Sequence, residues 1–146
     1  MNKSIKLLVV FSFLMSSLFM YGIPIITFSG GEGTSDNPYQ IATLADLRSL
    51  SENPGYWTNS KYFIQTADID ATETNTWNVG DHDGNAETAT VPMGFSCIGT
   101  STAGSFNGKY DGQGHVVSNL YINRPATNYV GLFGYINVST ATIRNL

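Results

Sequence analysis

The sequence predicts a mainly β fold, the start of a right-handed parallel β-helix preceded by a short capping helix and a signal peptide. Short apolar runs separated by Gly and Asn fill the chain after Phe95, and no helical period follows Ser51. Residues also recur at a spacing of 26, which relates Gly108 to Gly134, Val117 to Ile143, Asn119 to Asn145 and Leu120 to Leu146. A period of roughly 20–50 residues is typical of solenoids, in which each coil buries its apolar face against the next.

Other repeat folds fit this spacing less well. A leucine-rich repeat needs a Leu-x-x-Leu-x-Leu run that residues 116–120 lack, and a propeller blade needs about 40–45 residues. In a β-helix Val117 would lie over Ile143, about 4.8 Å away along the solenoid axis. Asn119 and Asn145 would then stack on each other at a corner.

Residues 1–29 are predicted to be a signal peptide. A basic start with Lys3 and Lys6 precedes an apolar stretch from Leu7 to Met20. Small residues at Thr27 and Ser29 favour cleavage after Ser29 over cleavage after Gly22. An uncleaved membrane anchor is the alternative, since residues 7–28 are long enough to span a bilayer. The predicted location is secreted or at a bacterial cell surface.

Residues 30–70 are predicted to form an N-terminal cap with one helix. The leader rich in Gly and Pro is followed by a short strand at Tyr39–Ile41 and a capping box formed by Thr43 and Asp46. Leucines at helical spacing then predict a helix that ends near Ser51. A β-type run follows from residue 62 to residue 66, and the alternation around residue 69 predicts that Asp68 and Asp70 face away from Ile69.

Residues 71–94 are predicted to be an acidic loop or insertion. Oxygen-bearing side chains occupy every second position at Asp81, Asp83, Asn85 and Glu87, a pattern that can surround calcium. The spacing of Gly and Glu is not that of an EF-hand, and a solvated acidic loop is the alternative. Calcium is the one cofactor that the sequence indicates.

The charge and the cysteine content exclude some classes of protein. Without the two lysines of the signal, five basic residues face eleven acidic ones, a balance of −6. Such a surface repels phosphate backbones, so we expect no nucleic-acid partner. Cys97 is the single cysteine and lies in an apolar run, so we expect it to be buried, although a reactive thiol is the alternative.

No catalytic motif is recognisable in this segment. The sequence has no Gly-x-Ser-x-Gly elbow and no HExxH, and His82 and His115 lack partners at zinc spacing. Gly112 and Gly114 are interpreted as turn residues rather than as a phosphate loop. The carboxyl pair Asp68 and Asp70 is the remaining enzymatic alternative, as a glycoside-hydrolysing pair. We expect no catalysis in this segment.

Aromatic side chains give the main indication of ligand binding. Flat rings on a solenoid stack on sugars or dock proteins, whereas alternation along strands buries about half of them. The ligand-stacking candidates are Tyr56, Trp57, Trp77 and Tyr121.

Residues 95–146 carry a resemblance to a repeat family. Phe106 to His115, then Ser118 to Ile122, then Val130 to Gly134 resemble the GLUG repeats, which are named for Gly-Leu-apolar-Gly. That motif stands here as Gly131, Leu132, Phe133 and Gly134. The resemblance implies β-solenoid coils in an exported bacterial protein, often adhesin-like, and we expect residues 95–146 to be a truncated set of these coils.

The sequence therefore predicts an exported cell-surface module that binds host or matrix glycans or proteins. The alternative is the N-terminal, non-catalytic region of a larger surface peptidase or polysaccharide-degrading β-helix enzyme. The resemblance implies the peptidase, because related repeats also sit beside the catalytic domain of immunoglobulin-A-cleaving metalloproteases, and β-helices also host polysaccharide lyases and glycosidases. The repeat ends in mid-pattern at Leu146, so we expect the chain to be an N-terminal fragment.

Overall fold

The computed structural model of the protein describes residues 28–79 and 91–146. Nearly all of the predicted signal peptide lies outside the described residues. So do His82 and the four candidate calcium ligands Asp81, Asp83, Asn85 and Glu87. Within the described part, no helix combines the length and the apolar character needed to cross a membrane.

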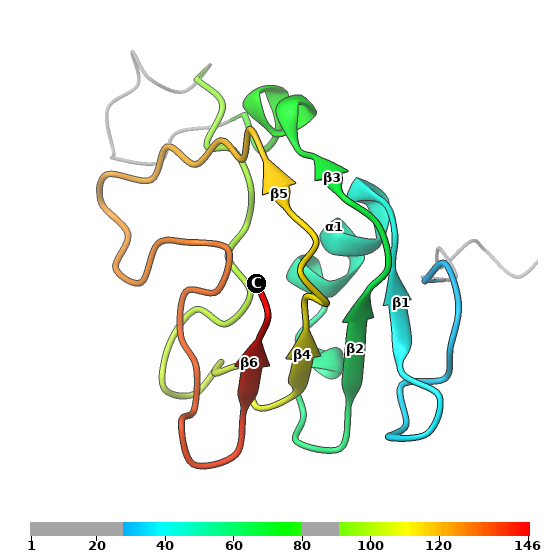
Figure 1. The fold of residues 1–146 in the computed structure, drawn as a ribbon. Coiled ribbons are helices and arrows are strands. Elements are labelled where there is room, and N and C mark those ends of the chain that lie inside the picture. Colours follow the sequence, from blue (N-terminus) through cyan, green and yellow to red (C-terminus); the bar gives the residue numbers. More distant parts are fainter. Residues whose placement is uncertain (1–27, 80–90) are drawn as a thin grey trace, which may run out of the picture.

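Two parallel sheets organise the fold (Figure 1). The larger sheet contains, in spatial order, β1 (Tyr39–Ile41), β2 (Tyr62–Gln65), β4 (Lys109–Asp111) and β6 (Thr142–Arg144). The smaller sheet pairs β3 (Ile69–Asp70) with β5 (Val117–Ser118). Every pairing between these named strands is parallel. The prediction of a mainly β fold with parallel strands is therefore confirmed.

The strand register differs from the predicted 26-residue frame. Ile143 lies beside Tyr110 rather than beside Val117, and Val117 lies beside Ile69. One row of the larger sheet runs through Tyr39, Phe63, Tyr110 and Ile143, at unequal intervals along the chain. Burial of the apolar side chains fixes the register of each strand. The loops between the strands differ in length, so the paired residues do not recur at a constant spacing along the chain.

The corner asparagines are present, but they do not stack on each other. Asn119 and Asn145 both have left-handed backbones, with φ of 57° and 52°. The Asn119 amide donates to Asp70 Oδ1 at 3.0 Å, and the Asn145 amide donates to Asp111 Oδ1 at 2.9 Å. Each asparagine therefore ties its own strand end to an aspartate on the neighbouring strand, and the predicted Asn119–Asn145 contact is wrong.

Helix α1 (Leu44–Glu52) confirms the local prediction for the N-terminal region. Thr43 caps it: its hydroxyl accepts from Asp46 N at 3.2 Å, and Asp46 Oδ2 accepts from Thr43 N at 2.9 Å. Two 3₁₀ turns, η1 (Pro54–Tyr56) and η2 (Thr72–Thr76), complete the helical content of the described residues. The predicted cap also supplies β1, β2 and β3, so it shares both sheets with the predicted coils.

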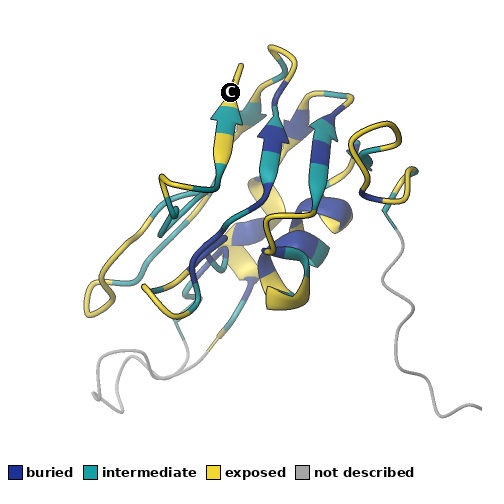
Figure 2. Ribbon diagram, turned by 90° about the horizontal axis from the view of Figure 1, so that it is seen from below, coloured by how far each residue is buried: buried dark blue, intermediate teal, exposed yellow. Residues whose placement is uncertain are grey.

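The core lies between the larger sheet and α1. Figure 2 shows buried positions on the strands and on the helices behind them. An aromatic row belongs to this core, with Phe106 5.2 Å from Phe133 and Tyr110 5.3 Å from Phe133 between ring centroids. The fully buried Gln65 accepts from the Tyr110 hydroxyl at 3.1 Å and donates to Val116 O at 3.3 Å. This buried network links the larger sheet to the chain that leads into β5.

The outer edge of β1 is covered by the segment before it. Gly30 forms an antiparallel bridge with Gln40, and the backbone nitrogen of Gln40 donates to Gly30 O at 2.8 Å. Phe28 packs 4.5 Å from Tyr39, and the Ser29 hydroxyl donates to Asp46 Oδ2 at 2.6 Å. Cleavage after Ser29 would remove the contacts of Phe28 and Ser29 and would leave the bridge at Gly30.

Candidate functional site

The Gly131–Gly134 motif has a structural role. Phe133 forms a parallel bridge with Ile98, and Gly134 N donates to Ile98 O at 2.9 Å. A Cβ on Gly134 would lie 2.3 Å from Tyr129 O, so only glycine fits this approach. Gly131 N donates to the sulfur of Cys97 at 3.4 Å, and Cys97 is buried as predicted. The motif therefore joins two strand-like segments.

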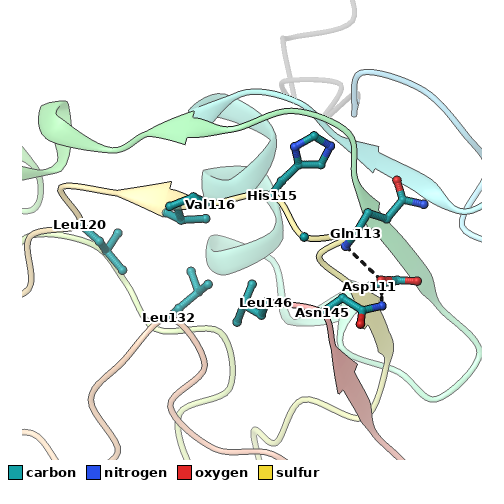
Figure 3. Close-up of a pocket in the computed structure, with 10 residues that line it drawn as sticks. Asp111, Gln113, His115, Val116, Leu120, Leu132, Asn145 and Leu146 are labelled. Carbon is teal, nitrogen blue, oxygen red and sulfur yellow. Dashed lines mark hydrogen bonds between the residues drawn. The ribbon is translucent and has the colours of Figure 1, made fainter.

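A groove of about 910 Å³ lies beside this motif, next to β5 and the end of β6 (Figure 3). Leu120, Leu132 and Leu146 gather on one side, and Asp111 and Asn145 lie on the other. The remaining lining residues are Gln113, Gly114, His115, Val116 and Val117. Apolar groups thus face a hydrogen-bonding rim, as in many ligand sites. The sequence indicated some of these residues as repeat positions but not as a ligand site, because they come from segments that meet only in the fold.

Asp111 is the fixed charge of the groove. Its Oδ1 accepts from Asn145 Nδ2 at 2.9 Å and from Gln113 N at 3.0 Å, and its Oδ2 lies 2.7 Å from Arg144 Nη2. The Asn145 hydrogen bond is the main cause that lowers the pKa of this carboxyl group, with Gln113 and Arg144 adding to it. The group therefore stays ionised and presents acceptor oxygens to a ligand.

The aspartates on either side of Ile69 serve as acceptors between neighbouring strands. Asp68 Oδ1 accepts from Val116 N at 3.0 Å and lies 3.1 Å from His115 Nδ1, and the backbone bond is the main cause that lowers its pKa. The pKa of Asp70 is lowered by the Thr72 hydroxyl first and by Asn119 next. The general acid of a glycosidase needs a raised pKa. Neither Asp68 nor Asp70 has this feature, because the pKa of each carboxyl group is lowered, and the hydrolytic pair stays a prediction.

A second hollow of about 430 Å³ lies beside the groove and shares Leu120 with it. Its lining also contains Thr72, Asn75, Asn119 and Tyr121. Tyr121 is 37% exposed, and its backbone amide donates to Thr74 Oγ1 at 2.9 Å. The hollow thus combines an accessible aromatic residue with amide and hydroxyl groups.

The other aromatic candidates are less accessible than the sequence predicted. Trp57 is 5% exposed and donates from its ring nitrogen to Leu50 O at 2.8 Å. Trp77 is 8% exposed, with the Arg48 guanidinium 4.4 Å from its ring centroid. Both indoles are core residues, so the prediction that they stack on a ligand is wrong. Tyr56 is half-buried, with its ring 5.0 Å from that of Phe28.

The described residues contain no group of three or more His, Cys, Asp or Glu side chains placed to hold a metal ion. The predicted calcium site falls on residues 81–87, outside the described part of the chain. Calcium binding stays a prediction.

Two curated proteins are similar to this chain over most of its length. Halomucin of Haloquadratum walsbyi is 33% identical over 116 residues, which are 80% of this chain and 1% of halomucin. A protein of Evansella cellulosilytica, named as a Gly-rich membrane protein, is 34% identical over 119 residues, 82% of this chain and 12% of that protein. The chain therefore spans a small part of both relatives. They support a surface or membrane-associated protein, the coarser part of our expectation.

No protein-family model matches the chain. No solved structure matches it either. The GLUG resemblance and the solenoid architecture stay predictions.

Proposed function

We propose that this chain is a non-catalytic module of an exported surface protein, with an adhesin-like role in binding glycans. The observation that carries the proposal is the hollow that the partly exposed Tyr121 lines together with Asn75, Asn119 and Thr72. Sugars present apolar C–H faces that pack on aromatic rings and hydroxyl groups that bond to amides.

The larger groove extends this surface. Because Leu120 lines both depressions, a chain of sugars in the hollow can continue towards Asp111 and Asn145. The ionised Asp111 accepts hydrogen bonds from sugar hydroxyls, while the leucines offer an apolar floor. A protein ligand is the second class that suits an apolar groove of this kind. We place both depressions on a β-solenoid of the GLUG type, in line with the parallel sheets.

Glycan binding is tested by printing glycans on an array and measuring the affinity of the best ligand by calorimetry. Tyr121→Ala is expected to weaken binding by about 10- to 30-fold, because truncating a central aromatic contact costs roughly 2 kcal/mol. Tyr129→Ala is the matched control: Tyr129 is also exposed, but it packs on Tyr135 and does not line the hollow. Equal affinities of the two variants, or no bound glycan at all, would contradict the proposal.

The second candidate is a non-catalytic region of a longer peptidase or polysaccharide-degrading enzyme. The chain spans 1% and 12% of its two relatives, so each relative has long regions beyond the matched part. Sequencing the surrounding gene distinguishes the two candidates. Further Gly-Leu-Phe-Gly copies support the surface module, whereas an HExxH helix supports the enzyme.

A further inference from the structure

The turn before β6 carries an Asn-x-Ser sequence that lines neither the groove nor the hollow. It consists of Asn137, Val138 and Ser139, and it is the only Asn-x-Ser/Thr triplet after the predicted signal in which the middle residue is not proline. This triplet is the acceptor pattern for N-linked glycans in exported proteins. The pattern alone is common, so the geometry of the turn decides whether it can act.

The turn is anchored at its base and open at its tip. Asn137 N donates to Phe106 O at 3.0 Å, and Asn137 O accepts from Ala141 N at 2.8 Å. Val138, at the tip, is 92% exposed. An enzyme can therefore approach the exposed tip while the hydrogen bonds at the base of the turn stay intact.

The Asn137 side chain is held with one end engaged and the other end available. Its Oδ1 accepts from the Ser139 hydroxyl at 2.7 Å and from Ser139 N at 3.2 Å. Its Nδ2 has no hydrogen-bond partner among the described residues. The described part of the chain contains no buried side-chain nitrogen or oxygen without a partner, so Nδ2 is not an unsatisfied buried donor.

We propose that Asn137 is an N-glycosylation site and that Ser139 positions its amide for the reaction. The co-reactant is an oligosaccharide joined through its anomeric carbon to a polyprenyl phosphate or diphosphate. Asn137 Nδ2 attacks that carbon, and the C–O bond to phosphate breaks with its electron pair leaving on the phosphate. A base of the membrane transferase takes the proton from Nδ2. Hydrogen bonding of the serine to Oδ1 fixes the amide plane during the attack.

The inference rests on the export that the proposed function includes. The test is mass spectrometry of the peptide that contains Asn137, from the full chain recovered outside the cells that naturally make it. We expect an oligosaccharide mass localised on Asn137 by fragmentation. Asn137→Gln and Ser139→Ala should each abolish it, whereas Ser139→Thr should keep it because threonine supplies the same hydroxyl. Asn128→Gln, an exposed asparagine outside any such triplet, is the matched control and should leave the glycan unchanged.

Two negative results have different meanings. An exported chain with a bare Asn137 overturns this inference and leaves the proposed function standing. A chain that stays inside the cell and is unmodified contradicts both. A glycan that survives Ser139→Ala shows that the serine does not position the amide, and it overturns the assigned role of the turn.

Discussion

Gly134→Ala should destabilise the fold by about 3 kcal/mol, because the strand-like segments on either side of this glycine approach too closely for a side chain. The new Cβ would lie 2.3 Å from Tyr129 O, 2.5 Å from Gly99 O and 3.0 Å from the Cβ of Cys97. Overpacking of this kind costs roughly 1–3 kcal/mol. Gly99 O also accepts from Tyr135 N at 3.0 Å, so moving it weakens a hydrogen bond worth about 1 kcal/mol.

The free energy of unfolding is measured by urea denaturation followed by tryptophan fluorescence. With a denaturant slope of about 2 kcal/mol/M, the midpoint should fall by about 1.5 M. Gly55→Ala is the control, because its Cβ would meet nothing within 4 Å. It should change stability by no more than about 0.5 kcal/mol. A Gly134→Ala midpoint within error of the parent chain would refute the packing argument.

Three further perturbations test the core, the helix cap and the acid response. Tyr110→Phe leaves the buried Gln65 Oε1 without its hydroxyl donor, so the free energy of unfolding should fall by about 2 kcal/mol. The urea midpoint should then fall by about 1 M. An unchanged midpoint would show that water replaces the donor. Thr43→Ala removes the hydroxyl cap of α1 and should lower the free energy of unfolding by about 1 kcal/mol, which is a decrease of about 3 °C in the Tm measured by circular dichroism. An unaltered Tm would mean that the cap contributes nothing to stability. The carboxyl groups of Asp70 and Asp111 have lowered pKa values when folded, so their stabilisation is present above the unfolded pKa of about 3.9 and is lost as the pH falls through the lower folded values. Tm should therefore decrease below about pH 4, and a Tm that rises on acidification would contradict the assigned hydrogen bonds.

Local features were predictable because the residues that form them are close in the chain. Thr43 and Asp46 lie three positions apart, so the capping box follows from their identities alone. The alternation around Ile69 likewise predicted one buried residue between two exposed carboxylates. In the candidate site, Tyr121 was correctly selected as an accessible aromatic residue.

Partners across the fold were not predictable in the same way. The burial of Trp57 and Trp77 depends on contacts with Leu50 O and Arg48, which a count of aromatic residues does not contain. The groove at Asp111 is also a product of distant segments, since Asn145 reaches it only after β6 pairs with β4.

By itself, the sequence determined the strand-forming segments, the capped helix, the turn glycines and the burial of Cys97, because each depends on residue type and near neighbours. The tertiary structure alone decided that Ile143 lies beside Tyr110 and Val117 beside Ile69. Two parallel strands have no short connection to fix their alignment, so register is chosen by which apolar faces fit the core. That choice also brings Tyr121 beside Asn75 and leaves the Asn137 turn exposed.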